Sequence, residues 1–342
     1  MSALSRLYGR VAQLRRAWYQ RQPHRVRHLT QPVISVGNLV VGGSGKTPVV
    51  AALARLLLAA GERPAILSRG YGRRRGADGV TVASDGRRVL QDTPATGDEP
   101  QMLARALAGV PVVVSSDRYL AGRLAERQFN CTVHLLDDGF QHVQLARDVD
   151  LLLMSSADLH ERVLPAGRLR EPLAAGRAAD AVLVTGTDEE AAAVAGALGV
   201  GTTFRVTPRY EELRCVHPFG APLAAATGRR VVAVAGIARP ERFFAALRAS
   251  GWDVAREIVF RDHHWFSARD LESIQKAAAE SNADLILTTE KDAMRLDALV
   301  ARPTAVFAFL PMHVVIEPAA SFAEWIADRL RAARLRRGTE AA

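Results

Sequence analysis

The sequence predicts an α/β protein with two α/β/α lobes, preceded by an N-terminal amphipathic helix, and a doubly wound, mainly parallel sheet in the first lobe. Three observations predict this fold. The chain has 342 residues, more than most single domains contain. Hydrophobic residues make up 49% and charged residues 24% of it, which is typical of globular proteins and excludes a largely disordered chain. Short apolar runs alternate with helical patterns, as they do in sheets covered by helices on both faces.

The basic charge of the chain is concentrated at its N-terminus. The net charge is +9, but residues 1–61 contain nine basic residues and no acid, so the rest of the chain is neutral. A neutral body gives no reason to expect a nucleic-acid partner. No uncharged apolar run approaches the roughly 18 residues of a membrane-spanning helix. Two cysteines are too few for a disulfide framework or a zinc cluster, which favours a reducing compartment.

Residues 1–30 contain the predicted amphipathic helix. Its apolar residues recur at spacings of three and four and fall on one side of the helix, and they are Leu4, Leu7, Val11, Leu14 and Trp18. Arginines lie mostly off this stripe. Such a cationic helix suits the surface of an anionic membrane. The alternative is a helix whose apolar stripe packs on the core of the protein.

A glycine-rich segment follows a short predicted strand at 32–36 and leads into a predicted helix at 48–60. This order is typical of the phosphate-binding loop of P-loop NTPases. Lys46 would contact the β- and γ-phosphates of a nucleotide, and the Thr47 hydroxyl would bind Mg²⁺. The predicted nucleotide-binding residues are Val40, Val41, Gly42, Gly43, Ser44, Gly45, Lys46 and Thr47.

An ordinary glycine-rich turn is the alternative, because Val40 stands where the full motif has a glycine. Lysine usage favours the nucleotide site. The chain has three lysines and 42 arginines, so a lysine at the motif position indicates a specific role.

A second strand, at 133–136, ends in two carboxylates, Asp137 and Asp138. The C-terminal end of a buried parallel strand is where a P-loop protein holds Mg²⁺, although a turn or a helix cap is the alternative. Between the two strands lies a basic loop at 69–75. Its arginines would either bind an anionic substrate or form a solvated surface loop.

The remaining patterns complete the two lobes. Further strands are expected at 65–68, 110–115, 149–154 and 181–185, with a surface hairpin at 80–90, and later at 231–235, 254–260, 284–288 and 304–310. Helices are expected at 240–250, 268–281 and 321–337. The predicted divisions are 1–30 for the N-terminal helix, 31–207 for the P-loop lobe, 208–230 for a linker, 231–318 for the second α/β lobe and 319–342 for a C-terminal helix and tail.

An ordered set of motifs, spread from Leu4 to about Trp325, resembles one known family. The motifs are Val36–Asn38 with Gly42–Pro48, Ser68–Gly72, Gly97–Pro100, Leu136–His142, Leu169–Pro172, Phe260–His264 and Thr288–Ala293. They resemble the motifs of the tetraacyldisaccharide 4'-kinases, the lipid A 4'-kinases of Gram-negative bacteria. The one visible departure is Ser44, where threonine is common, and both are small hydroxyl residues.

The resemblance implies transfer of the γ-phosphoryl group of ATP, with Mg²⁺, to the 4'-hydroxyl of a tetraacylated glucosamine disaccharide 1-phosphate, forming lipid IVA. It places this reaction at the cytoplasmic face of the inner membrane, with residues 1–30 on the membrane. It implies Asp98 and His263 as a catalytic dyad beside Lys46, with His264 as the alternative to His263. The implied metal ligands are Thr47, Asp137, Asp138 and Glu171.

Two other functions fit part of the sequence. A membrane-associated P-loop NTPase that hydrolyses ATP or GTP to regulate a partner would explain the phosphate loop, but it has no need of an Asp-His pair. A membrane- or RNA-binding module would explain only residues 1–30. In the second lobe, Lys291 and Asp292 would contact a purine base, or Thr289–Asp292 would simply start a helix.

Overall fold

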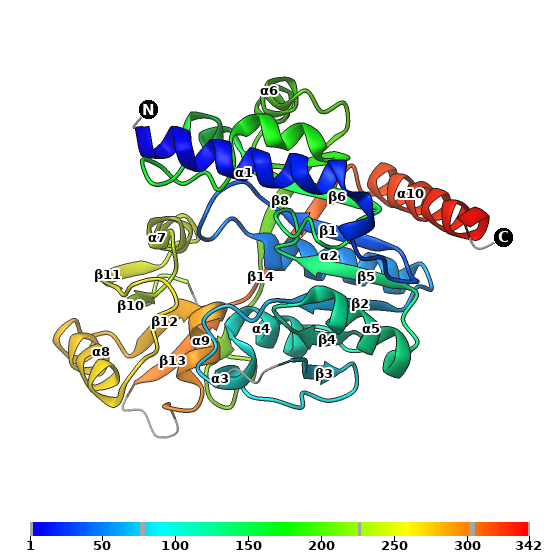
Figure 1. The fold of residues 1–342 in the computed structure, drawn as a ribbon. Coiled ribbons are helices and arrows are strands. Elements are labelled where there is room, and N and C mark those ends of the chain that lie inside the picture. The colour runs from blue at the N-terminus through cyan, green and yellow to red at the C-terminus, as the bar shows by residue number, and fades with distance from the viewer. Residues whose placement is uncertain (1–2, 76–78, 225–226, 301–304, 341–342) are drawn as a thin grey trace.

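The computed structural model describes residues 3–75, 79–224, 227–300 and 305–340, which form a nine-stranded and a five-stranded sheet (Figure 1). In the larger sheet every neighbouring pair is parallel except at the two edges. In spatial order its strands are β14 (Met312–Glu317), β8 (Thr203–Tyr210), β7 (Ala181–Thr185), β6 (Val149–Ser155), β1 (Val33–Gly37), β5 (Val133–Asp137), β2 (Pro64–Ser68), β4 (Pro111–Val114) and β3 (Thr81–Asp85). This confirms the predicted mainly parallel sheet.

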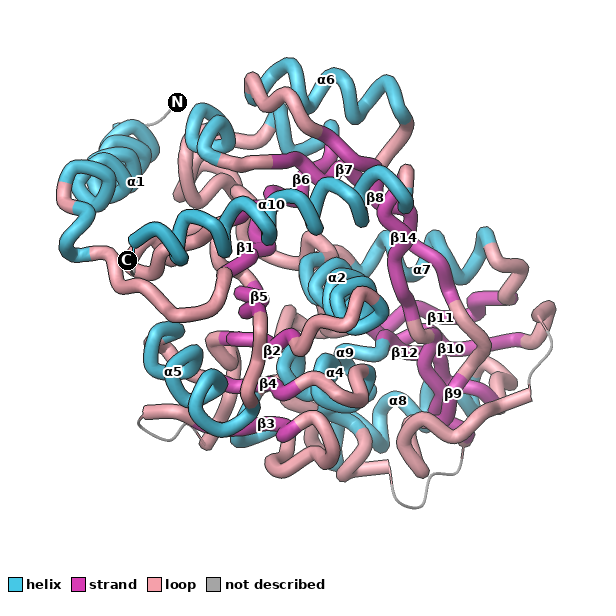
Figure 2. The backbone as a smooth tube through the Cα atoms, turned by 90° about the vertical axis from the view of Figure 1, so that its right-hand side faces the viewer, coloured by secondary structure: helices cyan, strands magenta, loops and turns pink. Residues whose placement is uncertain are grey.

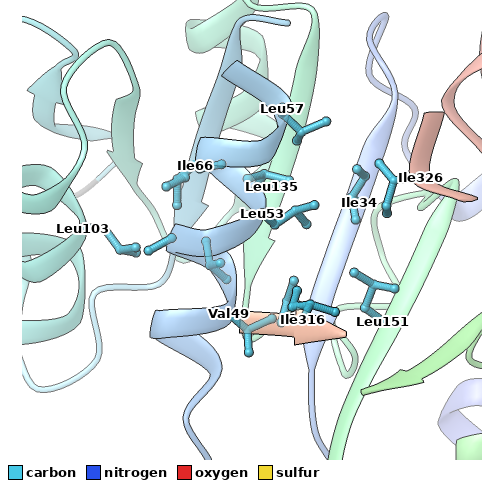
Figure 3. Packing of buried hydrophobic residues seen from close by; sticks show 14 of the residues in the cluster. Ile34, Val49, Leu53, Leu57, Ile66, Leu103, Leu135, Leu151, Ile316 and Ile326 are labelled. Atoms are coloured by element: carbon cyan, nitrogen blue, oxygen red, sulfur yellow. The ribbon is translucent and has the colours of Figure 1, made fainter. Parts of the chain in front are cut away.

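Helices cover both faces of this sheet, which makes it doubly wound. One face carries α2 (Lys46–Ala59), α4 (Asp98–Ala106) and α10 (Ala319–Glu340), and the other carries α5 (Arg118–Phe129) and α6 (Asp188–Leu198) (Figure 2). Figure 3 shows part of the largest core cluster, which includes Leu53 of α2, Leu135 of β5 and Ile326 of α10. Because both faces are buried, the central strands are continuous apolar runs, which is why the sequence reveals them. Shorter helical elements are η1 (Pro23–Arg25), α3 (Thr93–Thr96), η2 (Ser156–His160) and η3 (Leu173–Ala178).

The second lobe contains the five-stranded sheet. Its strands, in spatial order, are β11 (Asp253–Val259), β10 (Arg230–Ala235), β12 (Leu285–Thr289), β13 (Val306–Leu310) and β9 (Arg214–Cys215), and its helices are α7 (Pro240–Ala249), α8 (Ala268–Glu280) and α9 (Glu290–Leu296). Helix α9 packs against α4 of the first lobe, and the Thr93 hydroxyl donates a hydrogen bond to the Met294 carbonyl at 3.0 Å. The two lobes therefore meet along α3 and α4, since Arg105 in the last turn of α4 also forms an ion pair of 3.0 Å with Asp297.

The strands at the lobe boundary differ from the sequence prediction. β8 continues to Tyr210, inside the predicted linker 208–230, and β14 lies within the predicted second lobe 231–318 but pairs with β8 in the first sheet. The chain thus returns to the first lobe before α10. No strand is predicted at 312–317, and these residues are placed in the second lobe only by their position in the chain, which carries no information about the pairing of a strand. In the predicted hairpin at 80–90, the returning arm is reduced to a single bridge between Ser84 and Val89.

Helix α1 (Ala3–Arg21) turns its apolar stripe to solvent. Leu4 is 66% exposed, Leu7 61% and Leu14 67%, whereas Ser5 and Gly9 on the opposite side are buried. A Cβ atom on Gly9 would lie 3.3 Å from Cγ of Pro172, so the small residue allows the close approach. The alternative in which the stripe packs on the core is wrong. In the described part of the chain, no helix combines the length and the apolar character needed to span a bilayer.

Candidate active site

The glycine-rich loop starts where two central strands end side by side. Val36 of β1 is in register with Asp137 of β5, so the loop and the two aspartates share one edge of the sheet. Gly45 has a φ of 84°, a left-handed conformation that glycine adopts without strain, and it directly precedes α2. No side chain among the described residues caps α2, so its first N–H groups are left to bind an anion.

The first two predicted nucleotide-binding residues do not face this opening. Val40 is fully buried in the core, and the Val41 N–H donates a hydrogen bond to the Arg168 carbonyl at 2.8 Å. The open part of the loop is therefore Gly42 to Thr47. Beside Thr47 and Pro48 a cavity of about 640 Å³ extends along α2 toward the second lobe.

Lys46 and Arg170 meet at the carboxylate of Asp138. The Nζ atom of Lys46 lies 3.2 Å from Oδ1 of Asn38 and 3.5 Å from Oδ1 of Asp138. Arg170 donates a hydrogen bond of 2.8 Å to each carboxylate oxygen of Asp138. Burial raises the pKa of Asp138, but Lys46 and Arg170 outweigh it and hold that pKa well below its usual range. Asp138 is therefore ionised at neutral pH.

Asp137 has a different environment from its neighbour. Burial, together with the charges of Glu99 and Asp138, raises the pKa of Asp137 to about 7. Its Oδ2 accepts a hydrogen bond from the Ser68 hydroxyl at 3.2 Å, while its buried Oδ1 has no partner within the described residues. An unpaired buried carboxylate oxygen next to an ionised aspartate is suited to a divalent cation. The carboxylate oxygens of Asp137 and Asp138, together with the Thr47 hydroxyl, are suitable ligands for Mg²⁺.

Glu171, the fourth predicted metal ligand, is paired elsewhere. Arg16 of α1 donates hydrogen bonds of 2.9 and 3.0 Å to its two carboxylate oxygens, and the guanidinium of Arg16 also stacks on Phe140. Among the residues that the structure describes, no three His, Cys, Asp or Glu side chains gather around a metal position. The structure therefore brings Asp137 and Asp138 together at the loop and gives Glu171 a structural partner.

Asp98 and His263 come from different lobes and meet across their boundary. Asp98 begins α4, His263 follows β11, and Oδ2 of Asp98 lies 3.0 Å from Nδ1 of His263. Burial raises the pKa of Asp98, but the hydrogen bond from His263 and the charges of Lys291 and Arg295 outweigh it and keep that pKa below its ordinary value. Asp98 is thus an ionised carboxylate that is 3% exposed.

The backbone around His263 is held in an uncommon conformation. His263 has a φ of 58°, which costs a non-glycine residue on the order of 1 kcal/mol. Gly72 packs against the ring, where a Cβ atom would lie 3.3 Å from Nδ1. The adjacent His264 is instead directed to Asp270, with Nε2 3.1 Å from Oδ2, and its ring stacks on Phe260. The structure therefore pairs His263, and not His264, with Asp98.

The loop at 69–75 is docked beside this pair. The ring of Tyr71 lies 5.0 Å from that of His263, and the indole N–H of Trp265 donates a hydrogen bond to the Gly72 carbonyl at 3.2 Å. The guanidinium of Arg74 lies 4.7 Å from the centre of the Trp265 ring. The loop is therefore anchored at the lobe boundary, which a freely solvated loop would not be.

Three charged residues at the site escaped the sequence analysis, and a fourth, Lys291, was expected only as a purine contact. Arg170 and Glu99 stand inside two of the quoted motifs, and Lys291 is one of three lysines in the chain, so each had a signal. Arg118 had none. It is 4% exposed and faces both aspartates, and although burial lowers its pKa to about 10, it remains charged at neutral pH.

The proposed purine contacts at Asp292 are excluded by its position. The Asp292 carboxylate is fully buried, and it accepts hydrogen bonds from the Gly236 N–H at 2.9 Å and the Thr289 hydroxyl at 2.7 Å. Thr289 is the N-cap of α9. The alternative prediction, a helix start, is therefore confirmed.

Comparison with known proteins gives a consistent result over the whole chain. A family model described as tetraacyldisaccharide-1-P 4'-kinase matches residues 1–331. Relatives named tetraacyldisaccharide 4'-kinase include one from Geobacter metallireducens, 44% identical over 93% of this chain and 94% of the relative, and one from Geobacter sulfurreducens, 45% identical over 92% and 88%. A crystal structure of LpxK from Aquifex aeolicus in complex with ATP superimposes with a TM-score of 0.77 at 33% identity, covering 96% of this chain and 97% of that one.

Proposed function

The chain belongs to the tetraacyldisaccharide-1-P 4'-kinase family and transfers the γ-phosphoryl group of ATP to the 4'-hydroxyl of tetraacyldisaccharide 1-phosphate in lipid A biosynthesis, and we propose that Asp98 is the base in this transfer. The observation that supports this role is the pairing of ionised Asp98 with His263 at the lobe boundary, next to the phosphate loop. The alternative of a regulatory NTPase is not favoured, because the family is one of kinases.

Most of the catalysis in a phosphoryl transfer comes from positioning and charge stabilisation. The open segment Gly42 to Thr47 and the positive end of α2 bind the phosphates of ATP, and Lys46 stabilises the transferred group. When bound, Mg²⁺ neutralises charge on the phosphate oxygens, and Thr47, Asp137 and Asp138 would hold it.

Asp98 supplies the proton acceptor that the sugar hydroxyl requires. A hydroxyl is a weak nucleophile near neutral pH, and a positioned carboxylate that accepts its proton makes it a stronger one. The hydroxyl oxygen bonds to the γ-phosphorus as the bond from that phosphorus to the bridging oxygen of ADP breaks, so ADP leaves and the proton of the hydroxyl passes to Asp98. The anchored basic loop at 69–75 lies beside this position and would bind the anionic acceptor through its arginines.

Residues 1–30 associate with an anionic membrane, in our proposal, at the cytoplasmic face of the inner membrane. The support is the exposed apolar stripe of α1 on a helix that carries several arginines and no acid. The acyl chains of the substrate remain in the bilayer, so an enzyme resting on the surface meets the sugar without extracting the lipid. The protein would be peripheral, with the second lobe and the P-loop lobe on the aqueous side.

The test is product analysis with labelled ATP and the disaccharide 1-phosphate lipid. The wild type should add one phosphoryl group to the lipid. Asp98→Asn and His263→Asn should each lower kcat by about 100-fold or more and leave the KM for ATP little changed, since neither residue belongs to the phosphate loop. His264→Asn is the matched control and should keep kcat. Normal turnover by Asp98→Asn at saturating concentrations of both substrates would exclude Asp98 as the base.

A further inference from the structure

Lys291 contacts the side of His263 that is turned away from Asp98. Its Nζ atom lies 3.0 Å from Nε2 of His263, 3.4 Å from Oε1 of Glu99 and 3.5 Å from Oδ1 of Asp262. The side chain of Lys291 is 15% exposed. Both ring nitrogens of His263 are therefore engaged, Nδ1 by Asp98 and Nε2 by Lys291.

These two partners determine where the proton of the imidazole lies. Burial lowers the pKa of Lys291, but the charges of Glu99, Asp98 and Asp262 outweigh it and raise that pKa above its ordinary value, so the side chain is an ammonium. An ammonium has three donors and no lone pair, so Nε2 of His263 has to accept. The proton of the neutral ring is then on Nδ1, where it donates to the Asp98 carboxylate.

Asp262 is a second carboxylate close to His263, and Lys291 keeps it from pairing with Nε2. Oδ1 of Asp262 lies 3.9 Å from Nε2 of His263, and Lys291 sits against both groups. Without the ammonium, Nε2 of His263 would be free to carry a proton and donate it to Asp262. The other groups at this position are the ring of Tyr71, in edge contact with His263, and Arg295, whose Nη1 is 3.4 Å from Oδ2 of Asp98.

We propose that Lys291 is a positioning residue, which holds His263 as the neutral tautomer protonated on Nδ1 and thereby fixes the Asp98 carboxylate as the proton acceptor. The proposal deepens the proposed function and rests on its assignment of Asp98 as the base. Nε2 is occupied by Lys291, so His263 acts through Asp98 and does not itself take the proton of the acceptor hydroxyl. The only proton transfer in this step is from the hydroxyl oxygen to Asp98.

The test combines NMR of the ¹⁵N-histidine-labelled full chain with kinetics. The His263 signals are assigned by their loss in His263→Asn. The wild type should show Nδ1 protonated and Nε2 unprotonated at neutral pH. In Lys291→Met, Nε2 should become protonated, and kcat should fall about tenfold or more with the KM for ATP unchanged. Lys276→Met, at an exposed lysine of α8, is the matched control and should change neither.

Two further variants separate a positioning role from a structural one. Lys291→Arg keeps a cationic donor and should preserve the Nδ1–H tautomer with most of the activity. In the His263→Asn background, Lys291→Met should cause no further loss of kcat, because the lysine acts through the histidine.

An unchanged tautomer in Lys291→Met would overturn the proposal, and so would a raised KM for ATP with normal kcat, which would make Lys291 a nucleotide contact. An additive loss in the double variant would also overturn it. The NMR result does not depend on activity, so it stands apart from the base assignment. If Asp98→Asn turned over normally while Lys291→Met switched the tautomer, the proposed function would fail and the structural role of Lys291 would hold.

Discussion

At the scale of single residues, neighbouring carboxylates in this protein differ because their partners differ. Asp138 is ionised between Lys46 and Arg170, whereas burial and two nearby negative charges raise the pKa of Asp137 to about 7. The two residues are adjacent in the sequence and identical in type. Their surroundings differ: the carboxylate of Asp138 pairs with Lys46 and Arg170, whereas that of Asp137 accepts a hydrogen bond from Ser68.

Lys46 provides the sharpest single-residue prediction for ATP use. Lys46→Ala should lower kcat by about 1,000-fold while the protein stays folded, because the lysine stabilises charge that develops on the transferred group. The measurement is steady-state kinetics, with circular dichroism to monitor folding. Lys276→Ala removes an equal charge from an exposed position and should leave kcat intact. Equal rates for wild type and Lys46→Ala would exclude the phosphate-loop assignment.

Glu290 predicts a pH dependence of stability. Burial and the charge of Glu211 raise its pKa from 4.5 to about 7, so the folded state favours the protonated carboxyl. Its contribution is fully present below the pKa of the unfolded chain and is lost as pH rises through about 7. Between pH 5.5 and pH 8, this group should lower the free energy of unfolding of the wild type by about 2 kcal/mol, and Glu290→Gln should not show this decrease.

The measurement for Glu290 is urea unfolding of wild type and variant at both pH values without nucleotide. Glu324→Gln, at an exposed position of α10, is the control and should track the wild type. A Glu290→Gln variant whose unfolding free energy shows the same pH dependence as the wild type would contradict the prediction.

At the scale of elements, α1 is held by its polar side and leaves its apolar stripe free. Arg16 ties the helix to Glu171, and Gly9 lies against Pro172, both in the segment that carries Arg170. The same segment supplies the partner of Asp138. The helix proposed to rest on the membrane is therefore joined directly to the phosphate-loop region.

The exposed stripe of α1 predicts binding to anionic vesicles. Replacing Leu7 and Leu14 by Gln should weaken cosedimentation with vesicles containing phosphatidylglycerol, since each buried leucine contributes about 1.5–3 kcal/mol. Arg10→Gln should weaken binding mainly at low salt, because surface charge is screened. Leu120→Gln, at an exposed leucine of α5, is the control. Unchanged sedimentation of the double variant would show that the stripe does not contact the membrane.

At the scale of the whole molecule, the chain leaves the first lobe and returns to it. β14 completes the first sheet, and α10 packs three buried side chains, Phe322, Ile326 and Leu330, on its core. The lobes are also joined by α4 against α9 and by the ion pair of Arg295 with Asp98. The C-terminal residues therefore stabilise the lobe that carries the phosphate loop.

This crossing predicts that a change near the C-terminus destabilises the first lobe. Ile326→Ala should lower the free energy of unfolding by about 2–5 kcal/mol, because a fully buried side chain is lost from the core. Hydrogen exchange should localise the increase to β1, β5 and α2. Glu324→Ala, two residues away and exposed, should cost less than about 0.5 kcal/mol. Exchange that increased only in the second lobe would contradict the assignment of α10.

The sequence by itself determined the elements whose signal is local. Buried parallel strands are continuous apolar runs, and the phosphate loop and the strand-end aspartates are contiguous motifs, so each was predicted from its own residues. The predicted mainly parallel sheet and the membership of the kinase family are confirmed.

The tertiary structure alone decided the pairings between distant segments. Arg16 forms an ion pair with Glu171, a predicted metal ligand that lies 155 positions away in the sequence. Strand β14 pairs with β8, and Lys291 contacts His263 and Glu99. A side chain's partner depends on which surfaces the fold brings within a few ångströms, and periodicity and motif spacing carry no information about that distance.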